Sequence, residues 1–381
     1  MDNYALITLF IFVGILFLYI HITAQWKKSE DLEIYESDFR SRSQLQEVCD
    51  IRQPFMIRMR EHNPLFYERI RIDQLHKHDP VDVSVKDVRD YLNPHMNTVD
   101  SIPMQFHSAV RLFESDTGAK YVSEHNSEFL DETGLDSIFA TFDWAMKPDF
   151  TVYTNYDVLF GSRRANTPMR YHTHSRHFLA PTTGRIHVKM APWKSSKYLH
   201  PVKDYDAFEF RSPVPVWAKP GTVFGGSPGT QPPSQYAHDL EKVRMLEFDV
   251  VEGYVLYVPP YWWYSVQFSS DSTTTVGSIT YSTAMNSLAN LSDWSVYYLQ
   301  QNNITRKFVK PATTSPTERL GMDSAASVES HVEPAPVDTA DTPEVIGTGT
   351  AEPLDIASNV FVPEIVGEPK QIITNSGVYN V

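Results

Sequence analysis

The 381-residue chain is poor in cysteine and in basic charge. Its one cysteine, Cys49, has no partner for an intrachain disulfide, so a disulfide-stapled secreted scaffold and a cysteine-rich zinc module are both excluded. Lysine and arginine total 33 against 47 aspartates and glutamates, which gives a net charge of −14. A chain this acidic lacks the basic face that binds a phosphate backbone, so nucleic acid is not expected as a partner.

Several catalytic motifs are also missing. The chain contains no Walker loop, HExxH motif or dinucleotide fingerprint. Residues 225–229 match the serine-hydrolase pattern G-x-S-x-G in letters, but Pro228 has no N–H to act as an oxyanion donor. We interpret this segment as a loop.

Charged side chains are absent from residues 4–24, YALITLFIFVGILFLYIHITA. A helix of this length crosses a hydrocarbon layer of about 30 Å. Lys27 and Lys28 follow the run, and the positive-inside rule keeps them in the cytoplasm. The sequence therefore predicts a single-pass membrane anchor in residues 1–29, with the body of the protein on the cytoplasmic side.

The other end of the chain is poor in aromatic and basic residues. Residues 311–381 contain 11 acidic residues against Arg319 and Lys370, with Phe361 and Tyr379 as the aromatics. Such a segment buries too little apolar surface to offset its ordering entropy, so we expect an acidic, disordered tail. Its last part, 359–381, is more apolar and has two interpretations: a docking peptide, or a disordered end with scattered hydrophobic residues.

The body between these segments is expected to be mainly β with α additions. In residues 30–150 we expect a helix within 30–60, a strand end followed by a Ser84-capped helix within 81–92, and a short helix that Gly134 ends. Residues 151–310 alternate short β runs with turns, which indicates a sandwich or barrel. The expected strands are 151–160, 185–191, 214–218, 245–251, 253–258, 262–268 and 273–281, with turns at 181–184, 220–221 and 252–253.

The densest candidate site is TPMRYHTHSRHF, residues 167–178. On a strand, His172 and His174 share one face, as metal-binding histidine pairs often do, whereas His177 would point to the other face if the strand continued. A second segment, EGYVLYVPPYWWYSVQF at 252–268, has the pattern of a strand, a Pro-Pro turn, an aromatic corner and another strand.

Together the two segments resemble the JmjC-type, cupin-like family. In that family a T-P-x-H-x-D motif opens a double-stranded β-helix, and a later G-D-x-L-x-x-P-x-x-W-W-H motif supplies the third metal ligand. The resemblance covers roughly residues 53–286 and includes QPFMIR at 53–58 and GRIHVKMAP at 184–192. It implies a jelly-roll (cupin) barrel with an N-terminal helical support, Fe(II) held by two histidines and a carboxylate, and 2-oxoglutarate as co-substrate.

All three ligand positions of the family are substituted in this chain. They correspond to Arg170, His172 and Tyr264. A guanidinium is permanently cationic and cannot bind a metal, and a phenol ligates only as phenolate. We therefore expect no cofactor.

Three alternatives use the residues around these positions. A rewired metal site would draw on His172, His174, His187 and His238. An anion or co-substrate pocket would use Thr167, Arg170, Arg185 and Lys189, or Arg170 with Arg163 and Arg164. In the third alternative, Arg170 forms an internal salt bridge.

The aromatic corner also has two interpretations. Its tyrosines and tryptophans either fill the core, as we expect for Trp262, or form a protein-contact surface at the barrel rim. The residues concerned are Tyr254, Tyr257, Tyr261, Trp262, Trp263 and Tyr264.

These patterns predict a membrane-anchored pseudo-oxygenase that works as a binding or structural module, for example in a membrane-bound assembly such as a virion. Its partners would be the membrane, through residues 4–24, and proteins, through the barrel rim or the 359–381 end. The alternative is an Fe(II)/2-oxoglutarate-dependent hydroxylase or demethylase with a rewired metal site.

Overall fold

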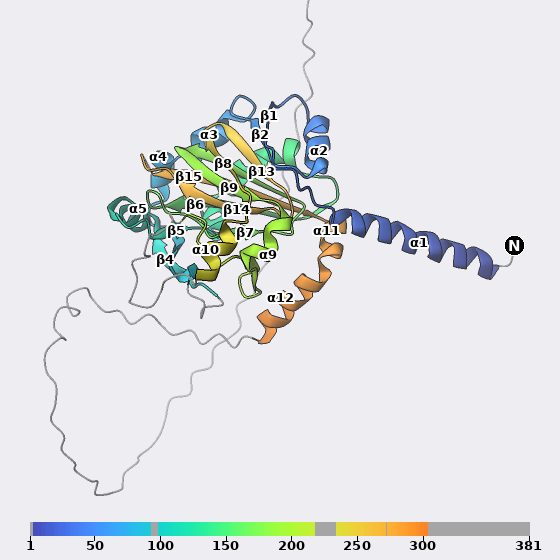
Figure 1. Ribbon diagram of the computed structural model, residues 1–381. Helices are drawn as coiled ribbons and strands as arrows, with labels where there is room; N and C mark the ends of the chain where they lie inside the picture. Colours follow the sequence, from blue (N-terminus) through green and yellow to red (C-terminus); the bar gives the residue numbers. More distant parts are fainter. Residues whose placement is uncertain (1–2, 93–97, 218–233, 272, 304–381) are drawn as a thin grey trace, which may run out of the picture. The chain divides into compact units, whose positions relative to one another are not determined.

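The computed structural model describes residues 3–92, 98–217, 234–271 and 273–303 (Figure 1). All of them belong to one compact unit that extends from Met1 to Phe308. The predicted acidic tail at 311–381, its docking end at 359–381 and the loop at 225–229 lie outside the described residues.

The predicted membrane segment is one continuous helix, α1 (Asn3–Gln25). It is long and apolar enough to cross a membrane, and none of its most hydrophobic stretch is buried in the protein. Figure 1 shows it leading away from the body. Only its C-terminal end meets the body, beside α11 (Ala284–Ala289).

The strands in the described residues form two sheets. Neighbouring strands are antiparallel, except that β1 and β2 are parallel. The larger sheet has the order β1 (Tyr35–Asp38), β2 (Phe55–Arg58), β13 (Tyr254–Val258), β8 (Arg176–Thr183), β15 (Thr274–Thr283), β6 (Thr151–Gly161), β5 (Tyr121–Ser123), β3 (Asp82–Asp87), β4 (Ile102–Gln105). The smaller sheet has the order β10 (Val202–Asp204), β11 (Glu209–Arg211), β7 (Arg170–Tyr171), β14 (Trp263–Phe268), β9 (Arg185–Ala191), β12 (Leu246–Val251).

Short helices complete the body. Those before β6 are α2 (Arg42–Ile51), α3 (Pro64–Arg69), α4 (Ile72–Leu75), α5 (Phe106–Ser115), α6 (Ser127–Thr133), α7 (Asp136–Phe139) and α8 (Asp143–Met146), with the 3₁₀ turns η1 (His76–His78), η2 (Asp90–Leu92) and η3 (Ala140–Phe142). Those after β9 are η4 (Trp193–Ser195), α9 (Ser196–Leu199), α10 (Ser234–Leu240), α11 and α12 (Leu291–Asn303).

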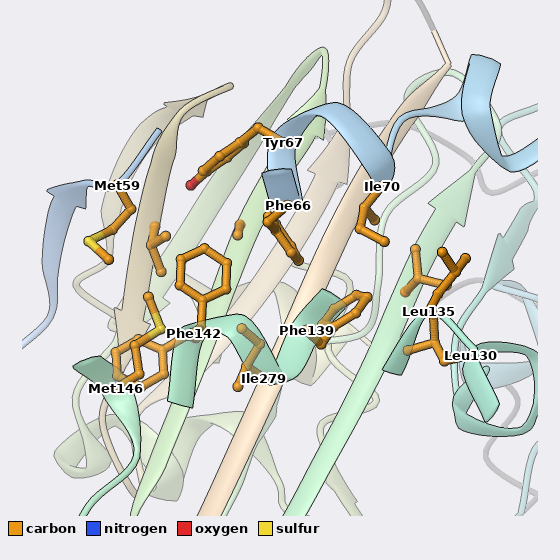
Figure 2. Packing of buried hydrophobic residues seen from close by; sticks show 14 of the residues in the cluster. Met59, Phe66, Tyr67, Ile70, Leu130, Leu135, Phe139, Phe142, Met146 and Ile279 are labelled. Carbon is orange, nitrogen blue, oxygen red and sulfur yellow. The ribbon is translucent and has the colours of Figure 1, made fainter. Parts of the chain in front are cut away.

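The two faces of the larger sheet bury different cores. On one face, side chains of the N-terminal helices pack against the strands, and Figure 2 shows Phe66, Phe139 and Phe142 lying over Ile279 of β15. On the other face, the larger sheet shares a core with the smaller sheet, to which Leu179 of β8 and Val188 of β9 contribute. The protein is therefore layered, with helices, the larger sheet and the smaller sheet in succession.

Most of the predicted strands are present. β6, β9, β12, β13, β14 and β15 match the expected runs within two residues at each end. β9 shows why they could be recognised. Its side chains alternate, with Ile186, Val188 and Met190 buried and with Arg185 and His187 on the opposite face.

Two predicted helices are also confirmed. A helix within 30–60 exists as α2, which Ser41 caps through its hydroxyl. α6 ends at Gly134, whose φ of 69° places it in the left-handed region.

Three local predictions are wrong. Ser84 does not cap a helix, because its segment pairs with β4 and β5 as strand β3. The strand predicted at 214–218 is not formed by residues 214–217, which are turn and irregular backbone. The turn predicted at 181–184 begins too early, since Pro181, Thr182 and Thr183 still belong to β8 and Gly184 alone separates it from β9.

Candidate functional site

A cavity of about 460 Å³ lies between the two sheets. The larger sheet lines it with side chains such as His177 and Leu179 of β8, and the smaller sheet with side chains such as Arg170 of β7 and Tyr264 of β14. The three positions that match the family ligand triad meet in this cavity. The Arg170 guanidinium lies 5.6 Å from the Tyr264 ring centroid, and the His172 and Tyr264 ring centroids are 6.2 Å apart.

Arg170 is held in a buried cluster of ion pairs. Its Nη1 lies 2.7 Å from Glu124 Oε2 and 3.2 Å from Glu209 Oε1. Lys86 Nζ lies 3.3 Å from Glu124 Oε1, and the Tyr91 hydroxyl donates to the same oxygen at 2.9 Å. All five side chains are at least nine-tenths buried. Contacts within the cluster therefore take the place of the water that would otherwise stabilise each charge.

The charge cluster, as we name these five residues, crosses between the sheets. Lys86 comes from β3 and Glu124 directly follows β5, both in the larger sheet, whereas Arg170 and Glu209 belong to β7 and β11 of the smaller sheet. Burial opposes ionisation of Glu124, but Arg170 and Lys86 outweigh it and hold the pKa of that carboxyl well below its usual range. Arg170 and Lys86 therefore keep the buried Glu124 carboxylate ionised.

Three histidines line the same cavity beside the charge cluster. His172 and His174 lie together as expected, with ring centroids 6.0 Å apart. His177 joins them, 4.9 Å from His172, because β7 ends at Tyr171 and the chain bends before β8 begins. We predicted that His177 points to the opposite face only if the strand continues through it. The strand is interrupted between Tyr171 and Arg176, so that prediction does not apply.

His172 and His177 are buried and His174 is half-buried, and all three are electrically neutral. Burial lowers the pKa of His172 to about 3 and that of His174 to about 4, and it lowers the pKa of His177 strongly as well. His172 Nε2 lies 3.1 Å from the Val258 carbonyl and donates to it, which leaves Nδ1 as an acceptor. That Nδ1 has no hydrogen-bond partner in the described part of the chain.

Aromatic rings form one end of the cavity. Tyr153 stacks on His174 at 5.6 Å, and Trp294 of α12 stacks on Phe208 at 4.2 Å. Trp294 also lies 6.2 Å from His174. The cavity is thus lined by neutral imidazoles, by aromatic rings and by three members of the charge cluster, Glu124, Arg170 and Glu209.

The other histidines proposed for a rewired metal site lie elsewhere. His187 sits on the face of β9 away from the inter-sheet core, 2.6 Å from Asp249 Oδ1 and 2.8 Å from Glu247 Oε1. His238 is an exposed residue of α10. Neither lines the cavity that contains His172 and His174.

The proposed co-substrate residues are likewise dispersed. Thr167 accepts a hydrogen bond from the Val266 amide with its hydroxyl and is fixed to β14. Arg185 lies 3.2 Å from Asp271, and Lys189 lies 3.5 Å from Glu247, both outside the cavity. Of the set, Arg170 alone lines it.

The arginines proposed to join Arg170 in an anion site do not reach it. Arg163 and Arg164 are exposed and do not line the cavity, while Arg170 itself is already paired with two carboxylates. The third alternative, an internal salt bridge of Arg170, is the one observed in the structure.

Most of the aromatic corner is core. Trp262 and Trp263 have no exposed surface, and Trp263 Nε1 donates to the Ser196 hydroxyl at 2.7 Å. Tyr257, Tyr261 and Tyr264 are also buried, which leaves Tyr254 as the partly exposed member. A protein-contact surface built from these six residues is therefore not available in the folded chain.

Sequence reasoning missed the acidic half of the charge cluster. Glu209 stands between Phe208 and Phe210, whereas Glu124 lies in a polar segment between Ser123 and His125. A carboxylate between two aromatic residues is the one local signal that could have marked Glu209, since such a group is buried only when it is paired, and no such signal marks Glu124. Lys86 was not recognised as a buried residue because its segment was predicted to be a helix, whereas it forms strand β3.

The residues at the family ligand positions do not fit an iron ion. Arg170 is cationic and fixed between Glu124 and Glu209, and burial raises the pKa of the Tyr264 phenol above its usual value. Residues 3–92, 98–217, 234–271 and 273–303 contain no group of three or more metal-binding side chains placed to hold a metal. No family model and no curated protein sequence matches this chain.

Proposed function

We propose that this protein is a membrane-anchored, non-catalytic relative of the cupin-like oxygenases that works as a binding module. The double-stranded β-helix of that family is the arrangement we infer for the two facing sheets. In support, the positions corresponding to two family ligands, Arg170 and Tyr264, are direct neighbours on β7 and β14. The helix α1 supplies the anchor.

The observation that carries the proposal is the ion-paired Arg170. A metal ligand must offer a lone pair, whereas Arg170 places a permanent positive charge at that position and two glutamates neutralise it. The same contacts argue against 2-oxoglutarate, because Arg170 is already paired with Glu124 and Glu209, and the further carboxyl group of Asp157 lines the cavity.

The rest of the cavity favours an uncharged ligand. The unpartnered His172 Nδ1 is a hydrogen-bond acceptor, and the rings of Tyr153, Phe208 and Trp294 offer flat apolar contact. A planar, uncharged molecule with one hydrogen-bond donor would match both the His172 acceptor and the aromatic rings. For protein partners we propose the surface around this cavity and the 359–381 end.

Metal and co-substrate binding by the full-length chain, purified in an uncharged detergent, tests the proposal. We expect no stoichiometric iron after anaerobic loading with Fe(II), no oxidative decarboxylation of 2-oxoglutarate, and no thermal shift with 2-oxoglutarate. One equivalent of iron that is lost in His172→Ala but kept in His238→Ala would overturn the proposal and support the hydroxylase instead. His238 is the matched control because it is exposed and lies outside the cavity.

A further inference from the structure

A second cavity, of about 560 Å³, lies where α1 joins the body. Trp26 and Lys28 line it, and both follow within three residues of the end of α1 at Gln25. The body contributes Trp193, Lys203, Tyr261 and Asp293. We call this cavity the juxtamembrane pocket.

The juxtamembrane pocket is fastened to the end of the membrane helix. Trp26 Nε1 donates to the Ala289 carbonyl at 3.2 Å, which ties the chain after α1 to α11. Arg52 of the body donates to the backbone carbonyls of Gln25 and Lys27. If α1 crosses the bilayer, these contacts hold the pocket at the level of the lipid headgroups.

Lys28 places a half-buried ammonium in this pocket. Its Nζ lies 3.9 Å from the Trp193 ring centroid and 4.5 Å from that of Tyr261. Among the described residues no carboxylate lies within ion-pairing distance of it, and its contacts are the two aromatic rings. A desolvated cation held only by aromatic faces retains the capacity to bind an anion.

The other charges of the pocket leave it positive. Lys203 Nζ lies 3.0 Å from Asp293 Oδ1, and the Tyr205 hydroxyl donates to the same oxygen at 2.7 Å. Asp293 is therefore occupied by Lys203 and Tyr205, and the charge of Lys28 is not cancelled. This balance sets the pocket apart in an otherwise acidic chain.

We propose that the juxtamembrane pocket binds the phosphate of a phospholipid headgroup, with the Lys28 ammonium as its ion partner. A basic pocket beside a membrane helix is suited to anionic headgroups. Trp26 and Trp193 supply the amphipathic rings that favour the interface between lipid and water. The proposal rests on the membrane anchor of the proposed function, but not on the absence of catalysis, so the iron and lipid experiments fail independently.

Titration of the full-length chain in dodecyl maltoside micelles tests this site. Tryptophan fluorescence is followed while dioctanoyl phosphatidylglycerol, dioctanoylglycerol or inorganic phosphate is added. We expect saturable binding of the phosphatidylglycerol, none of dioctanoylglycerol, which lacks the phosphate, and at least about tenfold weaker binding of inorganic phosphate, which lacks the lipid chains. Inorganic phosphate that binds as tightly as the lipid would overturn the lipid as the ligand.

Two adjacent lysines provide a matched pair of variants. Lys28→Gln should weaken phosphatidylglycerol binding about tenfold, because it removes a charge-assisted contact, whereas Lys27→Gln should change it less than about twofold. Lys27 is exposed and does not line the pocket. Equal weakening by both variants would indicate non-specific attraction of the lipid and overturn the site.

A third variant guards against loss of folding. Asp293→Asn removes the one carboxylate that lines the pocket among the described residues and keeps an oxygen for Lys203 and Tyr205, so it should strengthen binding of the phosphatidylglycerol. A thermal unfolding transition confirms that each variant is folded. Weaker or unchanged binding in a folded Asp293→Asn protein contradicts the proposed phosphate site.

Discussion

Arg170 illustrates how one side chain determines the character of a whole cavity. It stands at a position that corresponds to a family metal ligand, and its guanidinium bridges Glu124 and Glu209. Such a buried pair adds little net stability relative to apolar residues of the same size. Removing one partner, however, leaves the other charges buried without compensation.

Arg170→Gln should therefore lower the free energy of unfolding by about 3–5 kcal/mol, since Glu124 and Glu209 lose one of the two buried cations that they share, and Lys86 remains as the other. Urea unfolding followed by circular dichroism measures this loss. Arg163→Gln is the control, because Arg163 is exposed, and should change stability by less than about 0.5 kcal/mol. A loss for Arg170→Gln no larger than that of the control would show that the ion pairs do not hold the cluster together.

The three cavity histidines make stability depend on pH. Folding lowers the pKa of His172 to about 3 and that of His174 to about 4, and it lowers the pKa of His177 too, so the unfolded chain binds more protons below its own histidine pKa of about 6.5. Stability from this source is complete above pH about 6.5. It falls as the pH drops toward 4, by about 1.4 kcal/mol per pH unit for each histidine.

Replacement of His177 by glutamine separates this effect from general acid unfolding. The variant has no imidazole to protonate in the unfolded state, so its stability should fall less steeply than that of the native chain between pH 6.5 and 4. The melting temperature measured across this range gives the two slopes. Parallel slopes would exclude His177 as a source of the pH dependence.

At the scale of elements, the sequence predicted strands where one face is buried and the other is not. β9 alternates in this way, and its predicted bounds match. β8 was missed because it lies between β13 and β15 and is buried on both faces, so its sequence does not alternate. β3 was mistaken for a helix, since the Ser84 capping signal is local while the pairing of β3 with β4 and β5 is not.

The packing of α3 on β15 depends on a glycine. A Cβ on Gly277 would lie 2.5 Å from Phe66 Cζ and 3.1 Å from Phe139 Cε1. Gly277→Ala should therefore cost about 1–3 kcal/mol through overpacking, which urea unfolding measures. In a double-mutant cycle, adding Phe66→Leu should recover part of that loss, and strictly additive effects would contradict a direct clash.

At the scale of the whole molecule, the sidedness of the body depends on the charges that flank α1. Lys27 and Lys28 predict a cytoplasmic body. The full-length chain in sealed microsomes should accordingly be digested by added protease down to a short, membrane-protected fragment containing α1. A secreted protein serves as the protected control. Protection of the body from protease would reverse the predicted orientation.

The chain has two glycosylation sequons, Asn290-Leu-Ser and Asn303-Ile-Thr, and the first of them would report on sidedness less well than the protease experiment. The sequon at Asn290 is buried, and its Nδ2 donates to the Asn286 carbonyl at 2.9 Å, while its Oδ1 accepts from the Tyr261 hydroxyl. A glycan on this nitrogen is incompatible with the folded body. Absence of sugar at Asn290 therefore carries no information about orientation, and the protease experiment is the better measurement.

The sequence by itself determined what depends on local patterns: the apolar helix at residues 3–25, the alternating strands, and the lone pairs and charges that Arg170, His172 and Tyr264 can offer. Only the tertiary structure decided what surrounds them. Glu124 and Glu209 lie far from Arg170 in the chain, and long-range strand pairing brings them within 2.7 and 3.2 Å of its guanidinium. The ionisation of a buried group depends on the partners that folding assembles around it. The chemistry of this cavity is therefore determined by the tertiary structure.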